Sequence, residues 1–137
     1  VASDSSELIC VHDAVRPFVT KELIEKAVSG CSEHDGVIVA QPSTDTIKKV
    51  MDNQILETLQ REIIWRAQTP QVFSKSALQE ALKMAEEENI QGTDEASLLE
   101  RIGYQVGFVE GSSLNIKITT EEDWVFAEAI YNHLQHD

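Results

Sequence analysis

A small set of charged residues stands beside predicted turns in this 137-residue chain, where ligands are often bound. Asp13 follows the apolar run 8–11, a position that suits a metal ligand or a ribose ligand, although Asp13 could equally close a turn and pair with Arg16. Lys117 lies beyond a Gly/Ser-rich stretch, where its ammonium group could reach a phosphate as a point charge. The alternative for Lys117 is an ordinary solvated side chain.

Two threonines are further candidates for binding a ligand. Thr69 precedes Pro70, which restrains Thr69 to an extended conformation and could fix its hydroxyl toward a ligand; the alternative is a rigid turn. Thr93 precedes Asp94 at the start of a predicted helix, whose N-terminal amides could bind an anion. Helix capping explains Thr93 equally well.

Composition excludes several classes of function. The chain has 11 Lys plus Arg against 24 Asp plus Glu, a net charge of −13, which argues against binding a nucleic-acid polymer. No apolar stretch approaches the roughly 20 residues that span a bilayer, and the first residues lack the features of a signal peptide, which predicts a protein that is not secreted. Cys10 and Cys31 have no close spacing, which predicts buried free thiols in a reducing compartment.

The order of predicted elements is α/β throughout. Apolar runs predict strands, and helical spacing of apolar residues predicts helices. We expect strands at 8–11, 36–40, 105–109 and 115–118, and helices at 20–30, 74–88, 94–102 and from 120 onward. The last helix is expected to bury Trp124, Ala127, Ile130 and Tyr131. The first strand, helix and second strand form a crossover unit, which predicts parallel strands with helices over their faces.

Residues 45–59 follow a different pattern. Two strand-like runs, 46–50 and 55–59, are joined by a turn that contains Asp52 and Asn53, which predicts a hairpin. Because an isolated hairpin is only marginally stable, this arm, at about residues 45–62, is a candidate contact with a second subunit.

Two features concern what the chain lacks. Its six glycines include no Gly-x-Gly pair and no Walker-type spacing, so a glycine-rich triphosphate cradle is not expected in these residues. The chain begins with Val1 and enters an apolar strand by residue 8. Because strands buried on both faces rarely open a domain, we expect either a processed N-terminus or the later part of a longer polypeptide.

Six ordered motifs resemble the 2-C-methyl-D-erythritol 4-phosphate cytidylyltransferase family, over residues 7–131. They are VHDAVRP at 11–17, DTIK at 45–48, QR at 60–61 with Trp65, QTPQVF at 68–73, TDEAS at 93–97, and VEG at 109–111 with NIKIT at 115–119. The resemblance implies an α/β, Rossmann-like nucleotidyltransferase three-layer sandwich with a protruding β-hairpin arm. Residues 1–137 would be the C-terminal portion of one cytidylyltransferase domain, whose N-terminal strands are missing.

The resemblance also implies a reaction, the transfer of CMP from CTP to methylerythritol phosphate with Mg²⁺ assisting. Lys117 and Arg61 would position the acceptor phosphate. Asp13 would lie by the metal, the ribose and the acceptor, with Ala14 beside the nucleotide, and the acceptor would also be bound by Thr46, Thr69 and Thr93. The arm would reach into the second subunit of a homodimer, so that Thr46 and Arg61 serve the neighbouring site. The compartment would be a bacterial cytoplasm or a plastid.

Departures from the family pattern leave alternatives. Gln60 stands where the family usually has Asp, and the family's N-terminal loop, which holds the CTP triphosphate, is absent. We therefore expect no turnover of CTP by these residues alone. The alternatives are a ribitol-5-phosphate cytidylyltransferase, which shares the His-Asp-x-x-Arg-Pro and Thr-Pro-Gln elements, and a non-catalytic binding or dimerisation module.

Overall fold

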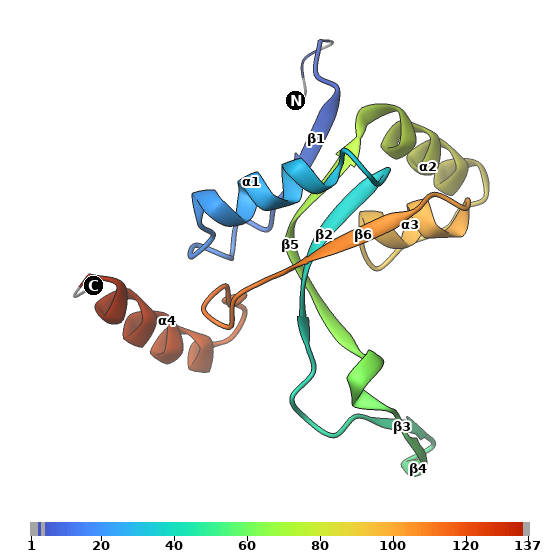
Figure 1. Cartoon of the computed structure of the whole chain (residues 1–137). Coiled ribbons are helices and arrows are strands. Elements are labelled where there is room, and N and C mark those ends of the chain that lie inside the picture. The colour runs from blue at the N-terminus through green and yellow to red at the C-terminus, as the bar shows by residue number, and fades with distance from the viewer. Residues whose placement is uncertain (1–2, 4, 136–137) are drawn as a thin grey trace.

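A four-stranded sheet with helices on both faces forms the body of the molecule, and a separate two-stranded hairpin projects from it (Figure 1). The computed structural model describes residues 3 and 5–135, so the outermost residues of the expected 1–137 unit lie outside the described part. The strands of the sheet, in spatial order, are β1 (Leu8–Val11), β5 (Trp65–Ser74), β2 (Gly36–Pro42) and β6 (Val106–Glu110).

The sheet is mixed rather than wholly parallel. Strands β2 and β6 pair in parallel, whereas β5 pairs antiparallel with both β1 and β2. The predicted crossover from β1 to β2 is present, but β5 lies between these two strands. Strand β5 was not predicted, because Pro70 lies within it and proline is normally excluded from central strands. A shift in the pairing of β2 with β5 next to Pro70 accommodates it.

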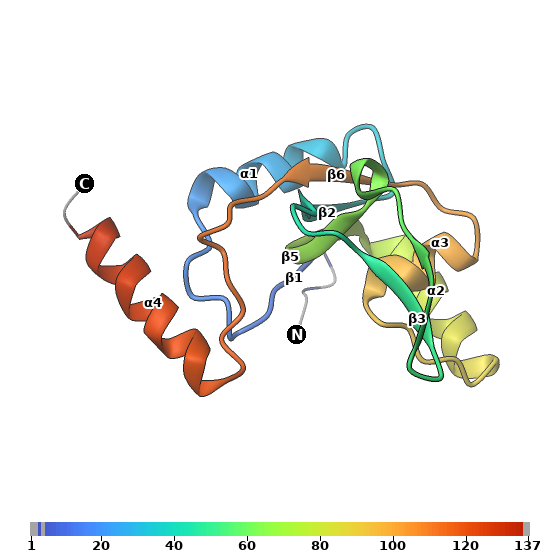
Figure 2. The same ribbon diagram turned by 90° about the horizontal axis from the view of Figure 1, so that it is seen from below.

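Three layers confirm the expected α/β sandwich. Helix α1 (Lys21–Gly30) covers one face, and α2 (Lys75–Glu87) and α3 (Glu95–Arg101) lie together on the other (Figures 1 and 2). Alternation along the strands produces this division: Val72 packs with Ala27 of α1, whereas its neighbour Phe73 packs with the residues of α2 and α3. Each helix begins where a side-chain oxygen caps it, at Thr20, Ser74, Asp94 and, for α4 (Glu121–Leu134), Thr120.

A tight contact at Gly36 gives a stability prediction. A Cβ atom at this position would lie 2.5 Å from Cδ1 of Phe73, whose side chain is fully buried. We therefore expect Gly36→Ala to lower the free energy of unfolding by about 1–3 kcal/mol through overpacking, measured by urea denaturation. Glu100→Ala, at an exposed helix position, is the control and should change it by less than about 0.5 kcal/mol. Equal stability of the two variants would contradict the packing described.

Four expectations are wrong in the described chain. Residues 115–118 form no strand, and α4 buries only Ala127, while Trp124 is 61% exposed and Tyr131 is also exposed. Strand β1 is half-buried among the described residues, where it pairs with β5 on one side. Both cysteines are free, as expected, but Cys10 is exposed on that strand and only Cys31 is partly buried.

Within the described residues, no helix is both long and apolar enough to cross a membrane.

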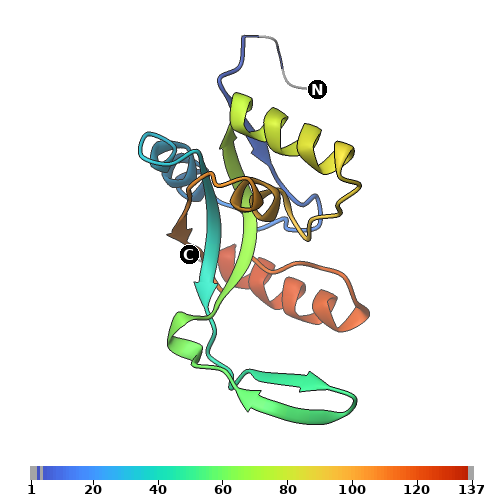
Figure 3. The same cartoon turned by 90° about the vertical axis from the view of Figure 1, so that its right-hand side faces the viewer.

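The hairpin arm confirms the prediction for residues 45–59. Strands β3 (Lys48–Met51) and β4 (Gln54–Thr58) are joined by Asp52 and Asn53, whose φ angles of 49° and 62° give the tight turn that such residues favour. Every residue of both strands is exposed, and the arm extends from the ends of β2 and β5 (Figure 3). Its apolar side chains, Val50, Met51, Ile55 and Leu56, therefore have no core to pack against in the described chain.

Candidate functional site

A cavity of about 500 Å³ lies among the predicted residues on the α2/α3 side of the sheet, and we call it the acceptor cavity. Four of the seven predicted site residues line it: Asp13, Thr69, Thr93 and Lys117. These residues are up to 104 positions apart in the sequence, so the fold alone brings them together. Arg16, Gln68, Gln71 and Asp94 line the same cavity.

The topology of the sheet explains this convergence. Strands β1 and β6 run in the same direction, and Asp13 and Lys117 come from the segments that follow their carboxyl ends. In α/β sheets, ligands bind beyond these ends. Thr69 comes from β5 at the irregular pairing, where Ile38 is opposite Gln71 and Val39 is opposite Gln68. Thr69 and Pro70, joined by a cis peptide bond, are therefore the residues that the bulge displaces beside Asp13.

Two cations meet the Asp13 carboxylate. Its Oδ2 atom lies 3.1 Å from Nζ of Lys117 and 3.3 Å from Nε of Arg16. Arg16 also donates from Nη1 to the backbone oxygen of Asn115, at 2.8 Å. The arginine therefore ties the Asp13 turn to the segment that carries Lys117, while the lysine side chain stays 46% exposed to solvent and accessible to a ligand.

These contacts set the ionisation of Asp13. Partial burial raises the pKa of the carboxyl, but the hydrogen bonds and charges of Lys117 and Arg16 outweigh it and hold the pKa below its ordinary value. The ionised carboxylate therefore stabilises the folded state at every pH above the ordinary value of about 3.9, and this contribution is lost as the pH falls through the lowered pKa.

An NMR titration of the Asp13 carboxyl tests this order of charges. We expect a midpoint below about 3.9 in the wild type and a higher midpoint in Lys117→Met, because one of the two cations is then absent. Lys83→Met, which removes an exposed lysine paired with Glu87 on α2, should leave the midpoint unchanged. A wild-type midpoint at or above about 3.9 is incompatible with the ion pairs described.

Thr69 holds neighbouring segments together through hydrogen bonds, a role that the sequence did not indicate. Its Oγ1 atom accepts a hydrogen bond from the backbone N–H of Asp13 at 3.0 Å and lies 2.9 Å from Nδ1 of His12. The backbone oxygen of Thr69 accepts from Nδ2 of Asn115 at 2.9 Å. Thr69 thus holds the Asp13 turn and the Lys117 segment against β5, in addition to lining the cavity.

Thr93 also lines the cavity, next to the start of α3. Asp94, rather than Thr93, caps this helix, since Oδ1 of Asp94 accepts from the backbone N–H of Ser97 at 2.9 Å. A carboxylate therefore already occupies the position at which an anion was expected to meet the helix amides. The cap leaves the Thr93 side chain exposed.

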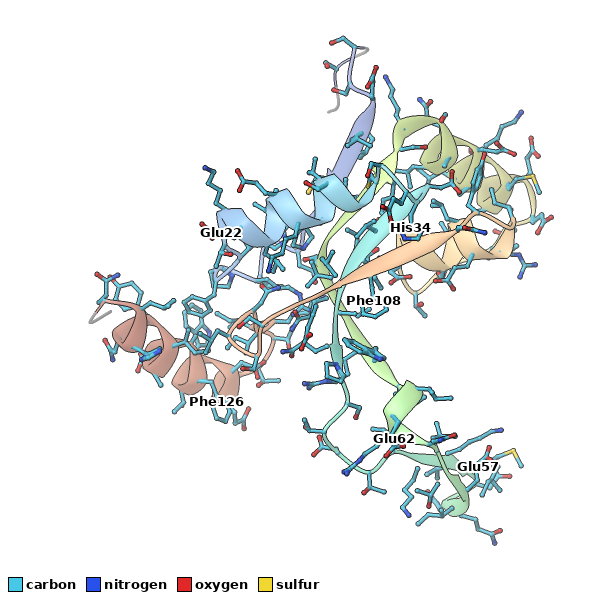
Figure 4. The ribbon with its side chains drawn as sticks, in the orientation of Figure 1. Glu22, His34, Glu57, Glu62, Phe108 and Phe126 are labelled. Carbon is cyan, nitrogen blue, oxygen red and sulfur yellow. The ribbon has the colours of Figure 1, made fainter. Side chains whose placement is uncertain are left out.

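Three predicted residues lie outside the acceptor cavity. Ala14 lines a neighbouring hollow with Val15 and Trp124. Thr46 and Arg61 belong to the arm, where Nη1 of Arg61 donates to the backbone oxygen of Thr44 at 3.2 Å. Figure 4 shows this part of the chain, with Glu57 and Glu62 labelled, well away from the sheet. Within one subunit, the arm residues do not contribute to the cavity.

Sequence reasoning missed two buried amides, Gln68 and Asn115, which brace the cavity. The Gln68 side chain donates to the backbone oxygen of Ser112 at 3.2 Å, and Asn115 donates to Thr69. Both lie in motifs that were noted for a neighbouring residue. The available signal was a polar residue inside an apolar or strand-like run, which is unusual for a buried position.

The donors of the cavity suit one particular kind of metal site. Among the described residues, no group of three or more His, Cys, Asp or Glu side chains could hold an ion. Asp13 supplies a single hard carboxylate, and both of its side-chain contacts to cations are to Oδ2. Mg²⁺ often binds through one or two carboxylates together with substrate phosphates and water, so Asp13 fits such an ion and does not fit a protein-enclosed one.

The fold and the cavity define an α/β protein of the Rossmann-like nucleotidyltransferase type, and the comparisons with known proteins agree. The sequence model of the family described as "IspD: 2-C-methyl-D-erythritol 4-phosphate cytidylyltransferase" matches residues 1–133. The chain belongs to this family. Its resemblance to the family, stated above on six motifs, is thereby confirmed.

Individual relatives show how far the similarity extends. Proteins named 2-C-methyl-D-erythritol 4-phosphate cytidylyltransferase from Geobacter metallireducens and Bacillus velezensis are each 47% identical, over 90% and 93% of this chain and 53% and 55% of their own length. A crystal structure of a 4-diphosphocytidyl-2C-methyl-D-erythritol synthase from Anaerococcus prevotii matches with a TM-score of 0.89 at 34% identity, over 96% of this chain and 59% of that one. The chain therefore spans about half the length of the curated relatives that it matches.

Proposed function

We propose that the intact product of this gene transfers CMP from CTP to 2-C-methyl-D-erythritol 4-phosphate, giving CDP-methylerythritol and pyrophosphate. The observation that carries the proposal is the convergence of Asp13, Thr69, Thr93 and Lys117 on one cavity beyond the carboxyl ends of β1 and β6. Family membership supports the same reaction, because the relatives quoted above bear the name of this activity.

The proposed reaction requires the protein mainly to position the substrates and to neutralise phosphate charge. An oxygen of the acceptor phosphate attacks the α-phosphorus of CTP, a new P–O bond forms, and the bond to the leaving pyrophosphate breaks. Lys117 holds the acceptor phosphate through its exposed ammonium group, and the Asp13 carboxylate keeps that ammonium group in place. Thr69 and Thr93, which both line the cavity, bind the acceptor. No covalent intermediate on the protein is needed.

Mg²⁺ is the proposed cofactor, with Asp13 as its protein ligand. When bound, it would neutralise charge on the phosphates of CTP. The cavity itself carries more carboxylates than cations, since Asp13, Asp94 and Glu95 face Arg16 and Lys117. A divalent cation would offset that excess for an anionic substrate.

The proposed assembly is a homodimer in which each arm reaches the other subunit. Exposed apolar residues on the arm, together with the exposed Ile63 at its base, support an intermolecular contact. In this arrangement Arg61 and Thr46 contribute to the neighbouring acceptor cavity, which explains why both lie far from the cavity of their own subunit. The quoted curated relatives are bacterial, which supports a bacterial cytoplasm as the compartment, with a plastid as the alternative.

An assay of pyrophosphate release from CTP and Mg²⁺ tests the function. The intact gene product is expected to release pyrophosphate with methylerythritol phosphate and to be at least about tenfold less active with ribitol 5-phosphate, because the pocket must fit a branched rather than a linear chain. The reverse preference would identify a ribitol-5-phosphate cytidylyltransferase. Failure to use or bind either acceptor would favour a dimerisation module.

A further inference from the structure

Gln71 is a buried polar residue of the cavity that the mechanism above does not use. Its side chain lies on β5, is 2% exposed and lines the acceptor cavity. Its Nε2 atom donates a hydrogen bond to Oδ2 of Asp94 at 3.0 Å, whereas Oε1 has no partner among the described residues. Burying an unpaired amide oxygen destabilises a fold, so this residue calls for an explanation beyond packing.

The partner of Gln71 is itself fixed at both oxygens. Oδ1 of Asp94 accepts from the backbone N–H of Ser97 and caps α3, while Oδ2 accepts from Gln71. Because a carboxylate only accepts hydrogen bonds, the amide of Gln71 must turn its nitrogen toward Asp94. The contact therefore has a defined direction, and it links β5 to the start of α3.

The hydrogen bond between Gln71 and Asp94 lies close in sequence to two residues that line the cavity. Gln71 lies two residues after Thr69 on β5, and Asp94 directly follows Thr93. One hydrogen bond thus joins the two segments that supply Thr69 and Thr93 to the cavity. The segment before Thr93 contains Gly92 and the positive-φ residue Asn89, and it is irregular from residue 88 to residue 94.

We propose that Gln71 is a positioning residue, which holds Asp94 and thereby places Thr93 at the acceptor cavity that Thr69 and Lys117 also line. The inference rests on the proposed function, because acceptor use is one of its readouts. Loss of the link should weaken acceptor binding more than it slows the chemical step, since the Gln71 side chain bonds to Asp94 and, among the described residues, makes no hydrogen bond to Lys117.

Exchanging the amide and the carboxylate between positions 71 and 94 tests this role. Gln71→Glu places a second carboxylate beside Asp94, and we expect the KM for methylerythritol phosphate to rise by about tenfold with kcat within about threefold of the wild type. In the double variant Gln71→Glu/Asp94→Asn, the amide now at position 94 can donate to the carboxylate now at position 71 and still cap α3, so the KM should return to within about threefold of the wild type. Asp94→Asn alone is the control for the cap: the side-chain oxygen now at position 94 can still accept from the Ser97 N–H and the Gln71 amide can turn to meet the new amide, so the first amides of α3 should exchange at the wild-type rate.

A second measurement does not depend on the substrate. Amide hydrogen exchange over residues 88–97 should be faster in Gln71→Glu than in the wild type and should return to the wild-type rate in the double variant. Gln71→Met, which removes the hydrogen bond without adding charge, covers the case in which Gln71→Glu does not fold.

The outcomes separate the two proposals. Lack of wild-type activity with methylerythritol phosphate counts against the proposed function, and the exchange measurement then still decides the role of Gln71. Unchanged exchange in both Gln71 variants, or a defect in Gln71→Glu that the double variant does not relieve, would overturn the positioning role.

Discussion

Lys117→Met in the intact gene product is expected to lower kcat/KM for methylerythritol phosphate by about 100-fold or more. Lys117 lines the acceptor cavity with its ammonium group 3.1 Å from Asp13, and it is the more exposed of the two cations there. Removing a charged donor that faces a reacting phosphate typically costs two to three orders of magnitude. The loss should appear in steady-state kinetics with the acceptor varied at saturating CTP.

Matched variants separate charge from geometry. Lys83→Met removes an exposed lysine from α2 and should change kcat/KM by less than about twofold. Lys117→Arg keeps the charge but replaces a point charge by a planar group, so we expect an intermediate loss. If Lys117→Met retained activity within about threefold of the wild type, Lys117 would not hold the acceptor phosphate.

Arg61→Ala should cause a loss of similar size, although Arg61 lies outside the cavity of its own subunit. We attribute the effect to the neighbouring cavity, which the arm of a second subunit would complete. Mixing inactive Arg61→Ala and Lys117→Met subunits then tests the arrangement directly. Each mixed dimer would have one site with both defects and one site with neither, so an equimolar, randomised mixture should recover about one quarter of the wild-type activity.

The control for this experiment is each variant mixed with itself, which should stay inactive after the same dissociation and reassociation. Size-exclusion chromatography with light scattering should give a dimer throughout. Absence of recovery in a mixture that contains mixed dimers would show that Arg61 acts within its own subunit or not at all.

The sequence predicted the elements with strong local signals. Thr20, Ser74 and Thr120 start helices where they were expected to, and Asp52 and Asn53 form the turn of the arm. These features depend on neighbouring residues, because caps and tight turns are satisfied by groups within a few positions. They could therefore be read without knowledge of the tertiary fold.

Features that depend on distant residues could not be predicted in this way. Strand β5 contains Pro70 and was not predicted as a strand, because only its place beside β1 and β2 makes it a central strand. Residues 115–118 are apolar enough for a strand, yet side-chain hydrogen bonds such as Asn115 to Thr69 hold them in place instead. Most large apolar residues of α4, including the labelled Phe126 in Figure 4, fit a helix pattern but remain exposed in the described chain.

The candidate site also contains residues that could be predicted from the sequence and residues that could not. Asp13, Thr69, Thr93 and Lys117 were identified because they belong to recognisable motifs, and the fold brings them together. The bracing roles of Arg16, Gln71 and Asn115 appeared only with the structure, because each depends on a partner at least 23 positions away. Motifs thus indicated which residues line the cavity, and the tertiary structure indicated which residues hold them.

A crystal structure of the intact gene product with methylerythritol phosphate tests the central claim most directly. We predict that the phosphate lies within hydrogen-bond distance of Nζ of Lys117 and that the carbon chain lies between Thr69 and Thr93. Density for the phosphate outside this cavity, with Lys117 still paired only with Asp13, would contradict the account.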